Sequence, residues 1–344
     1  LTVQLSVKFN SFGFQTNDEV NDMTFYKYKV LNFSTSALDS TYFGQWVDAD
    51  LGAFDDDYVG CDTALDLGIC YNGDAVDGET TPNYGENPPI VGTDFFQGPK
   101  KYFTNTEGFL DSVTLGMSAF LWYNNDFSNV GNPTEAAHYY GYLSGSWKDG
   151  TRFTKGGTGH GGTEPFNFMF PDDPSDPDGW SECTENNEPD DRRYLQSSGP
   201  FRLEPGAKNE VIVGVVWVRP PTQVSCQANF DAIRAADKKA QALFDADFEI
   251  IDGPDAPDIA IRELDREIIL SLHNADNSNN ANEAYEATDP IIAQIVSDDN
   301  TGTITDSTYN FQGYIIYQLK NGLVSPSEYS DRDKARPIAQ VDTV

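Results

Sequence analysis

The densest group of potential metal ligands in the sequence is a run of aspartates that follows Trp46. Alternating Asp side chains on a turn that contains Gly52 can converge on one hard cation, and calcium takes six to eight oxygen ligands. Crowded carboxylates also repel one another, and a divalent ion relieves that repulsion. We therefore predict a calcium site in this loop. Its candidate ligands are Asp48, Asp50, Asp55, Asp56, Asp57 and Asp62.

Two further acidic segments are candidates for cation binding. The first contains Asp74 and Asp77, and the second contains Asp176 and Asp178 and continues, rich in acids, to Asp191. The loop after Trp46 is not an EF-hand, because its glycine falls one position early and no Glu closes it. The alternative for each segment is an acidic loop exposed to solvent, which the prolines favour in the segment around Asp176.

The cysteines predict disulfides and an oxidising compartment. The chain has four cysteines, and they lack the Cys-x-x-Cys spacing of zinc or redox sites. Cys61 and Cys70 are close enough in sequence for a local bridge, and Cys183 and Cys226 could close a longer loop. The alternative is four buried free thiols. An even number of cysteines in an acidic, methionine-poor chain favours an oxidising environment.

Signatures of catalysis are weak in this sequence. The Gly-rich stretch at 155–163 lacks the Gly-Lys-Ser/Thr ending of a phosphate-binding loop. His138, His160 and His273 lie far apart, and none begins a His-Glu-x-x-His motif. We assign no catalytic residue, although a pair of carboxylates for glycoside hydrolysis carries no fixed spacing.

Aromatic residues near the acidic loops suggest a sugar-binding platform. Apolar ring faces suit the C–H surfaces of sugars, and carboxylates suit their hydroxyl groups. We favour core packing instead, because Tyr and Trp commonly line sandwich interiors. The residues concerned are Trp46, Tyr58, Tyr71, Tyr84, Trp147 and Trp180.

The composition excludes several classes of function. The 344 residues include 22 Lys and Arg against 55 Asp and Glu, a formal net charge of −33. The chain lacks the basic face that nucleic acids or an anionic membrane surface would require. No run of about 20 apolar residues is present to cross a bilayer. An aromatic content of 13% indicates a folded chain. We expect neither nucleic-acid binding nor membrane insertion.

The elements that must position these residues are mostly strands. Between Phe25 and Leu31, apolar side chains and lysines alternate with a period of two, which is typical of a half-buried strand. The longest apolar run, Val211–Val218, predicts a buried central strand within Glu210–Val218. Gln227–Phe248 has apolar residues at helical spacing, which predicts one amphipathic helix packed on a sheet.

A change of composition near Ile251 predicts a second domain. The stretch Gly253–Asp258 contains two prolines and is typical of a linker. We predict a mainly β chain: a loop-rich β-sandwich-type domain with one amphipathic helix over 1–252, then a fibronectin type III-like sandwich over 253–344. A fibronectin type III domain needs about seven strands. We therefore expect this domain to be incomplete and the chain to belong to a larger protein. The strands predicted in it span 259–261, 267–272, 311–319 and 335–341.

Several long strings resemble large secreted proteins of Bacteroidetes-type bacteria. These proteins are exported by the type IX secretion system and typically carry a C-terminal sorting domain, which is not visible here. The resemblance implies a place outside the cell or on its surface, at the exterior of the outer membrane, and it implies no catalytic residue. The strings are YFGQWVDADLG (42–52), DDYVGCD (56–62), YNGD (71–74), NPPIVGTDFFQGP (87–99), RRYLQSSGPF (192–201), AQALFD (240–245) and FQGY (311–314).

Together these features predict a non-catalytic structural or adhesion module of the cell exterior, stabilised by calcium in its Asp-rich loops. The expected partners are other surface or matrix proteins, glycans, or further copies of the chain. The alternatives are a glycan-binding module and a secreted hydrolase with an unrecognised pair of carboxylates.

Overall fold

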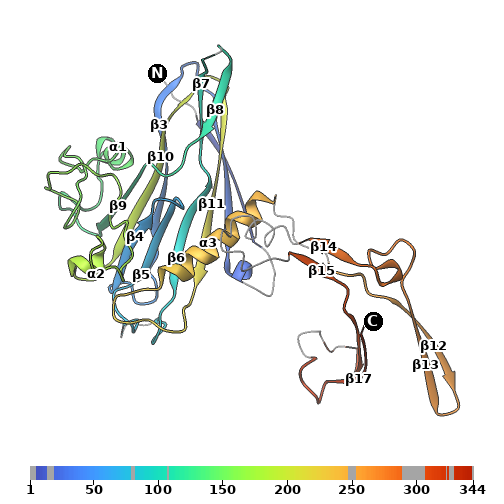
Figure 1. The fold of residues 1–344 in the computed structure, drawn as a ribbon. Coiled ribbons are helices and arrows are strands. Elements are labelled where there is room, and N and C mark those ends of the chain that lie inside the picture. The colour runs from blue at the N-terminus through green and yellow to red at the C-terminus, as the bar shows by residue number, and fades with distance from the viewer. Residues whose placement is uncertain are drawn as a thin grey trace. The chain divides into compact units, whose positions relative to one another are not determined.

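The chain is mainly β and divides into two compact units. The computed structural model describes residues 5–13, 19–78, 82–106, 108–246, 253–288, 307–322, 324 and 329–342. The first unit covers 1–241 and the second covers 242–344 (Figure 1). The boundary predicted from the sequence lies later, after residue 252.

The first unit is a sandwich of two antiparallel sheets. Its larger sheet has six strands in the order β1-β2-β11-β6-β5-β4. The two strands predicted at Phe25–Leu31 and Glu210–Val218 are confirmed as β2 and β11, which pair with each other inside this sheet. The bounds are β1 Leu5–Gly13, β2 Thr24–Asn32, β4 Asp57–Asp62, β5 Leu67–Asn72, β6 Ile90–Gln97 and β11 Lys208–Val218.

The smaller sheet lies against the larger one and closes the core. It has three strands in the order β3-β10-β9. Val59 and Phe95 of the larger sheet and Phe120 and Tyr194 of the smaller sheet belong to one buried cluster between them. The bounds are β3 Leu38–Asp48, β9 Ala119–Asn124 and β10 Arg192–Leu203, and a separate hairpin consists of β7 Lys100–Thr104 and β8 Leu110–Thr114.

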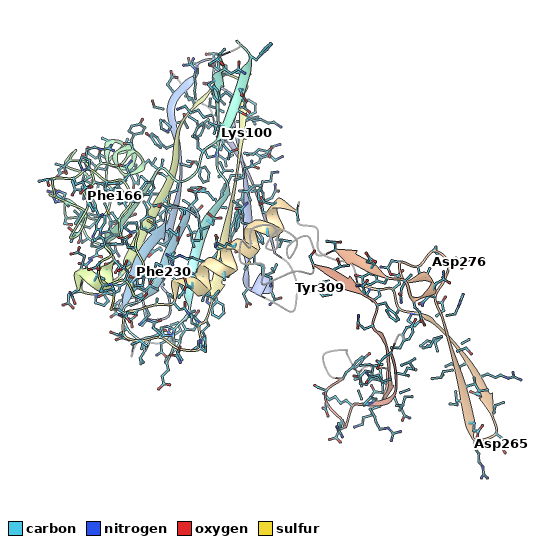
Figure 2. All side chains as sticks on the ribbon, viewed as in Figure 1. Lys100, Phe166, Phe230, Asp265, Asp276 and Tyr309 are labelled. Carbon is cyan, nitrogen blue, oxygen red and sulfur yellow. A yellow bond between two sulfur atoms is a disulfide. The ribbon has the colours of Figure 1, made fainter. Side chains whose placement is uncertain are left out.

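The predicted amphipathic helix is confirmed as α3, Phe230–Asp245, which lies across the larger sheet (Figure 1). Figure 2 labels Phe230 at its start, where the Phe230 ring meets the ring of Tyr71 edge-on at 5.3 Å. Ile233 packs against Gly92 of β6. The apolar residues fall on one face at helical spacing, and the sheet buries that face. The shorter helices are η1 Glu19–Asp22, α1 Ala136–Ser144 and α2 Glu182–Glu185.

The cysteines form one disulfide, between Cys183 and Cys226, as predicted. The predicted Cys61–Cys70 bridge is wrong, because both residues are free thiols inside the core. They lie on paired strands, but Cys61 is opposite Gly68 and Cys70 is opposite Val59. Residues offset by two in this way are about 7–8 Å apart, beyond the usual reach of a disulfide.

The second unit consists of two-stranded antiparallel ladders. The strands predicted in this region are confirmed, and their apolar side chains include Ile261 and Ile268, each 65% exposed. Within the described residues the three ladders do not pair with one another, so the fibronectin type III-like assignment stays a prediction. The bounds are β12 Asp258–Leu264, β13 Glu267–His273, η2 Ala281–Glu283, β14 Glu286–Thr288, β15 Thr308–Asn310, β16 Gly313–Leu319 and β17 Ala335–Asp342.

Two buried carboxyl groups lie where α3 packs on the larger sheet. Asp94 of β6 and Asp237 of α3 are each 1% exposed. The Oδ1 atom of each accepts no hydrogen bond from any described residue. Burial raises the pKa of Asp237 to about 8. Burial also raises the pKa of Asp94, and the nearby charge of Asp237 raises it further. Asp237 is therefore held in the neutral form near pH 7, and the same burial favours the neutral form of Asp94.

The substitution Asp237→Asn is expected to remove a pH-dependent loss of stability. An unfolded Asp ionises near pH 4, whereas folded Asp237 keeps its proton up to about pH 8. The folded state therefore binds more protons across this range, and its free energy of unfolding falls as the pH rises. Asn stays neutral, so the variant should gain a few kcal/mol relative to wild type between pH 5 and pH 8. Urea unfolding of wild type and variant at pH 5 and at pH 8 measures this difference in the free energy of unfolding.

The matched control is Asp231→Asn, on the same helix, because the side chain of Asp231 is 93% exposed. Its unfolding should keep the pH dependence of wild type. An Asp237→Asn variant with the same pH slope as wild type would contradict the burial of a neutral carboxyl group under α3.

Candidate metal centre

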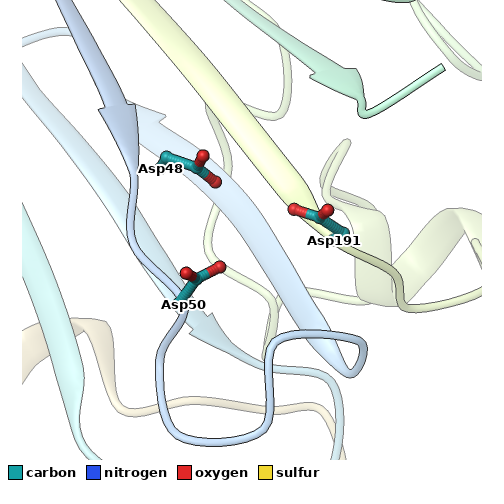
Figure 3. A group of neighbouring side chains, drawn as sticks. All are labelled: Asp48, Asp50 and Asp191. Carbon is teal, nitrogen blue, oxygen red and sulfur yellow. The ribbon is translucent and has the colours of Figure 1, made fainter.

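Three aspartates converge where β3 ends and β10 begins. Asp48 is the last residue of β3, Asp50 lies on the loop that follows, and Asp191 directly precedes β10. One carboxylate oxygen from each lies within 4.8 Å of the other two, and the three side chains point toward one another (Figure 3). This group, called here the β3–β10 acid group, could hold a metal ion.

The strand register explains the convergence. Asp48 pairs with Arg193 across the antiparallel β3–β10 ladder. Because the strands are antiparallel, Asp50, two residues after Asp48, lies near Asp191, two residues before Arg193. Side chains two positions apart on a strand lie on the same face. The pairing therefore gathers the acids on one face of the smaller sheet.

Arg193 partly neutralises this group and leaves two oxygens without partners. Its Nε lies 3.0 Å from Oδ2 of Asp48, and its Nη2 lies 3.6 Å from Oδ2 of Asp191. The Oδ1 atoms of Asp48 and Asp191 are buried and accept no hydrogen bond from the described part of the chain. Three carboxylates beside one guanidinium leave a formal charge of −2. That charge complements a divalent cation.

Asp50 lies in an environment that disfavours its charged form. Burial raises the pKa of its carboxyl group, the charges of Asp48 and Asp191 raise it further, and Arg193 opposes them. Asp50 also has a φ of +40°, in the left-handed region that Asp tolerates better than most residues. This conformation turns the chain after β3. A bound cation would relieve the repulsion and favour the ionised form.

Neighbouring side chains hold Asp191 in place. Oδ1 of Asp190 accepts the backbone N–H of Asp191 at 2.8 Å, and Oδ2 of Asp190 accepts from Nδ2 of Asn124 at 2.9 Å. Asn125 Nδ2 donates to Oδ2 of Asp191 at 3.3 Å. Asp191 is thereby tied to the end of β9 as well as to β10.

The next residue, Arg192, forms a buried ion pair. Its Nη2 lies 2.8 Å from Oε2 of Glu182, and the two side chains are 2% and 0% exposed. Arg192 Nη1 donates to Asn124 at 2.6 Å, and its guanidinium lies 4.6 Å from the ring centre of Trp122. Glu182 Oε1 accepts the backbone N–H of Val59 at 2.9 Å. The start of β10 is therefore fixed against both sheets and α2.

Three of the other predicted ligands fold the acidic loops onto one another. Asp56 accepts the backbone N–H of Gly78 at 2.7 Å, and Asp77 accepts that of Ala53 at 2.8 Å. Asp57 is 1% exposed, and its Oδ2 accepts from a backbone N–H in the same loop. Burial raises the pKa of Asp57 to about 8. Here the carboxyl groups act as backbone acceptors.

The remaining predicted ligands lie apart from the β3–β10 acid group. Asp55 and Asp178 are exposed. Asp62 forms an ion pair with Arg234 at 2.8 Å. Asp74 accepts the N–H of Val76 at 2.7 Å, and Asp176 accepts that of Asp178 at 3.0 Å. Across the described ranges, no second group of three His, Cys, Asp or Glu side chains converges in this way. For these acids, metal binding stays a prediction.

Sequence reasoning placed Asp48 and Asp50 in a metal site but did not include Asp191. Asp191 was noticeable only as part of an acidic segment. Its proximity depends on the β3–β10 ladder, in which Arg193 meets a residue 145 positions earlier. Only a prediction of that pairing would have found it.

Most of the aromatic residues near the acidic loops pack in the core, as favoured from the sequence. Tyr58, Tyr71, Trp147 and Trp180 are buried. Trp46 is 50% exposed and lies two residues before Asp48 on β3, so it shares a face with the β3–β10 acid group. Its Nε1 donates to the hydroxyl of Tyr123 at 2.6 Å. The six rings therefore do not form a common platform.

Comparison with known proteins assigns the chain to no family. No protein-family model matches it, and no curated protein matches it. In the described part of the chain, every helix is too short or too polar to span a lipid bilayer. The chemistry of the sites is therefore the basis for inferring function.

Replacing Arg192 is expected to destabilise the fold strongly. Arg192→Met leaves Glu182 charged and buried without its partner, a change that typically costs about 3–5 kcal/mol. A double variant with Glu182→Gln keeps an acceptor for Val59 but removes the charge, so it should recover part of the loss. Equilibrium unfolding in urea measures both. A loss below about 1 kcal/mol in the single variant would contradict the central role of this pair.

Proposed function

We propose that this chain is a non-catalytic structural or adhesion module of the cell exterior, stabilised by calcium at the β3–β10 acid group. The observation that carries the proposal is the convergence of Asp48, Asp50 and Asp191, with two buried oxygens that lack partners. A divalent ion would satisfy both oxygens and neutralise the residual charge.

The donor atoms favour calcium over other metals. The group offers carboxylate oxygens and neither sulfur nor imidazole nitrogen. Transition metals such as zinc and copper favour those softer ligands. Magnesium demands near-ideal octahedral geometry, whereas calcium accepts irregular sets of six to eight oxygens. Backbone carbonyls and water would complete the shell around a calcium ion.

Calcium at this position would link three segments of the first unit. Asp48 ends β3, Asp50 belongs to the next loop, and Asp191 leads into β10. An ion that binds only the folded form adds about 2.7 kcal/mol of stability at 100 times its dissociation constant. Extracellular modules bind calcium at roughly 0.1–1 mM. Stability of the module would therefore follow the calcium content of the medium.

Two features support a place outside the cell. The Cys183–Cys226 disulfide fits an oxidising compartment. The sequence also resembles surface proteins that the type IX secretion system exports to the exterior of the outer membrane. In that setting, the partners we propose are surface or matrix proteins, glycans or further copies of the chain.

A hydrolase is the less favoured alternative. The clearest pair of buried carboxyl groups, Asp94 and Asp237, is 1% exposed beneath α3, where a substrate has no access. Nε2 of His160 forms a hydrogen bond with Oδ2 of Asp149 at 2.9 Å. Neither arrangement combines a nucleophile or an acid–base pair with an open cleft.

Calcium is expected to bind chelator-treated protein and to raise its melting temperature. In millimolar calcium, with a dissociation constant of about 0.1–1 mM, the rise should be about 1–5 °C, from the linkage free energy and the size of the folded unit. The double variant Asp48→Asn/Asp191→Asn should lose both effects, because it removes two of the three carboxylates. Titration calorimetry and thermal melts with and without millimolar calcium measure this.

The matched control is Asp176→Asn/Asp178→Asn, which removes two carboxylates from an acidic loop away from the β3–β10 acid group. It should bind calcium as wild type does. Unchanged melting of wild type in calcium would refute the proposal. Binding that survives in Asp48→Asn/Asp191→Asn would place the ion elsewhere.

A further inference from the structure

A pocket of about 470 Å³ lies in the second unit, and none of the described residues that line it is a predicted metal ligand. Its walls come from Gly253 and Pro254, from Tyr285 just before β14, and from the 309–313 segment that joins β15 to β16. The volume falls in the range of small-molecule sites, about 300–1,000 Å³. Figure 2 labels Tyr309 on this part of the chain.

Hydrogen bonds between its walls define the shape of this pocket. Phe311 donates its backbone N–H to the carbonyl of Tyr285 at 3.0 Å, next to the β14–β15 ladder. Asn279 Nδ2 donates to the carbonyl of Gly253 at 2.9 Å. The N–H of Tyr285 donates to Oδ1 of Asn280, which is fully buried. The 309–313 segment is thus bonded directly to Tyr285, and the side chains of Asn279 and Asn280 bond to Gly253 and Tyr285.

Gly313 fixes the edge of the pocket at the start of β16. Its φ is +140°, and a Cβ atom there would lie 2.1 Å from the carbonyl oxygen of Val341. Only glycine allows β16 and β17 to pair so closely at this point. Glycine at this position therefore permits the β16–β17 pairing beside the pocket.

The walls combine aromatic rings with neutral amides. Tyr285 is 7% exposed, whereas Tyr309 is 50% exposed. The side chains of Asn310 and Gln312 are exposed, and Nε2 of Gln312 donates to the carbonyl of Asn310 at 3.3 Å. A side-chain amide both donates and accepts hydrogen bonds. None of the described residues that line the pocket is charged, although the chain has 55 acids. A charged ligand would find no ion-pair partner there.

We propose that this pocket binds a neutral saccharide unit of a glycan. The C–H faces of a sugar ring match the rings of Tyr309 and Tyr285, and its hydroxyl groups match the amides of Asn310 and Gln312. A proline-rich peptide also packs on aromatic rings, but proline has no backbone N–H to donate, whereas sugar hydroxyl groups both donate and accept, as side-chain amides do. The inference is independent of the calcium proposal, because no carboxylate is among the described residues that line the pocket.

Affinity electrophoresis of the full chain tests this inference. Native gels would contain dextran, laminarin, galactomannan or arabinoxylan, with a chelator present so that calcium plays no part. We expect at least one of these neutral polysaccharides to retard wild type. Tyr309→Ala should weaken that binding roughly tenfold, because ring contacts are worth about 1 kcal/mol or more. Tyr309→Phe should retain it, because the ring stays.

The matched control is Tyr139→Ala, which removes a ring that is 55% exposed on α1 of the first unit. It should be retarded as wild type is. Retardation by none of the four polysaccharides, or retardation that survives in Tyr309→Ala, would overturn the inference. Calorimetric binding of a decaproline peptide that Tyr309→Ala abolishes would assign the pocket to peptides instead.

Discussion

The buried ion pair between Arg192 and Glu182 is the interaction on which the first unit depends most. Two charges removed from water need every available hydrogen-bond partner. Here those partners come from β4, β9 and α2, so satisfying the pair joins both sheets. Because successive side chains alternate along a strand, Asp191 and Arg193 then lie on the face of the sheet opposite to Arg192. The same constraint that closes the core thereby presents Asp191 and Arg193 to Asp48.

Several carboxyl groups in this chain have structural roles inside the fold. Asp56, Asp57 and Asp77 accept backbone N–H groups and fold two loops together. Burial between α3 and the larger sheet raises the pKa of Asp94 and of Asp237 and favours their neutral forms. Acids whose charge is compensated in these ways add little repulsion to the folded state. The β3–β10 acid group differs because two of its buried oxygens still lack a partner.

Local patterns in the sequence predicted the elements well and the contacts between them poorly. Alternation identified β2, the longest apolar run identified β11, and helical spacing identified α3, because each signal lies within one element. Proximity in sequence misled the assignment of Cys61 and Cys70, since their strands pair with an offset of two. Asp48 and Asp50 were found by local density. Asp191 was missed because a ladder between distant segments brings it into place.

The Cys183–Cys226 disulfide encloses β10 and β11, which belong to different sheets. Their partners β3 and β2 lie far earlier in the chain, and such distant pairings form slowly because a long loop must close. A four-residue connection already joins β10 to β11, and the covalent ring also holds the start of β10 near the end of β11 in the unfolded chain. When β10 pairs with β3, the ring therefore holds β11 close to β2, and the reverse holds when β11 pairs first. Oxidation before folding would therefore make the two sheets assemble together rather than in succession.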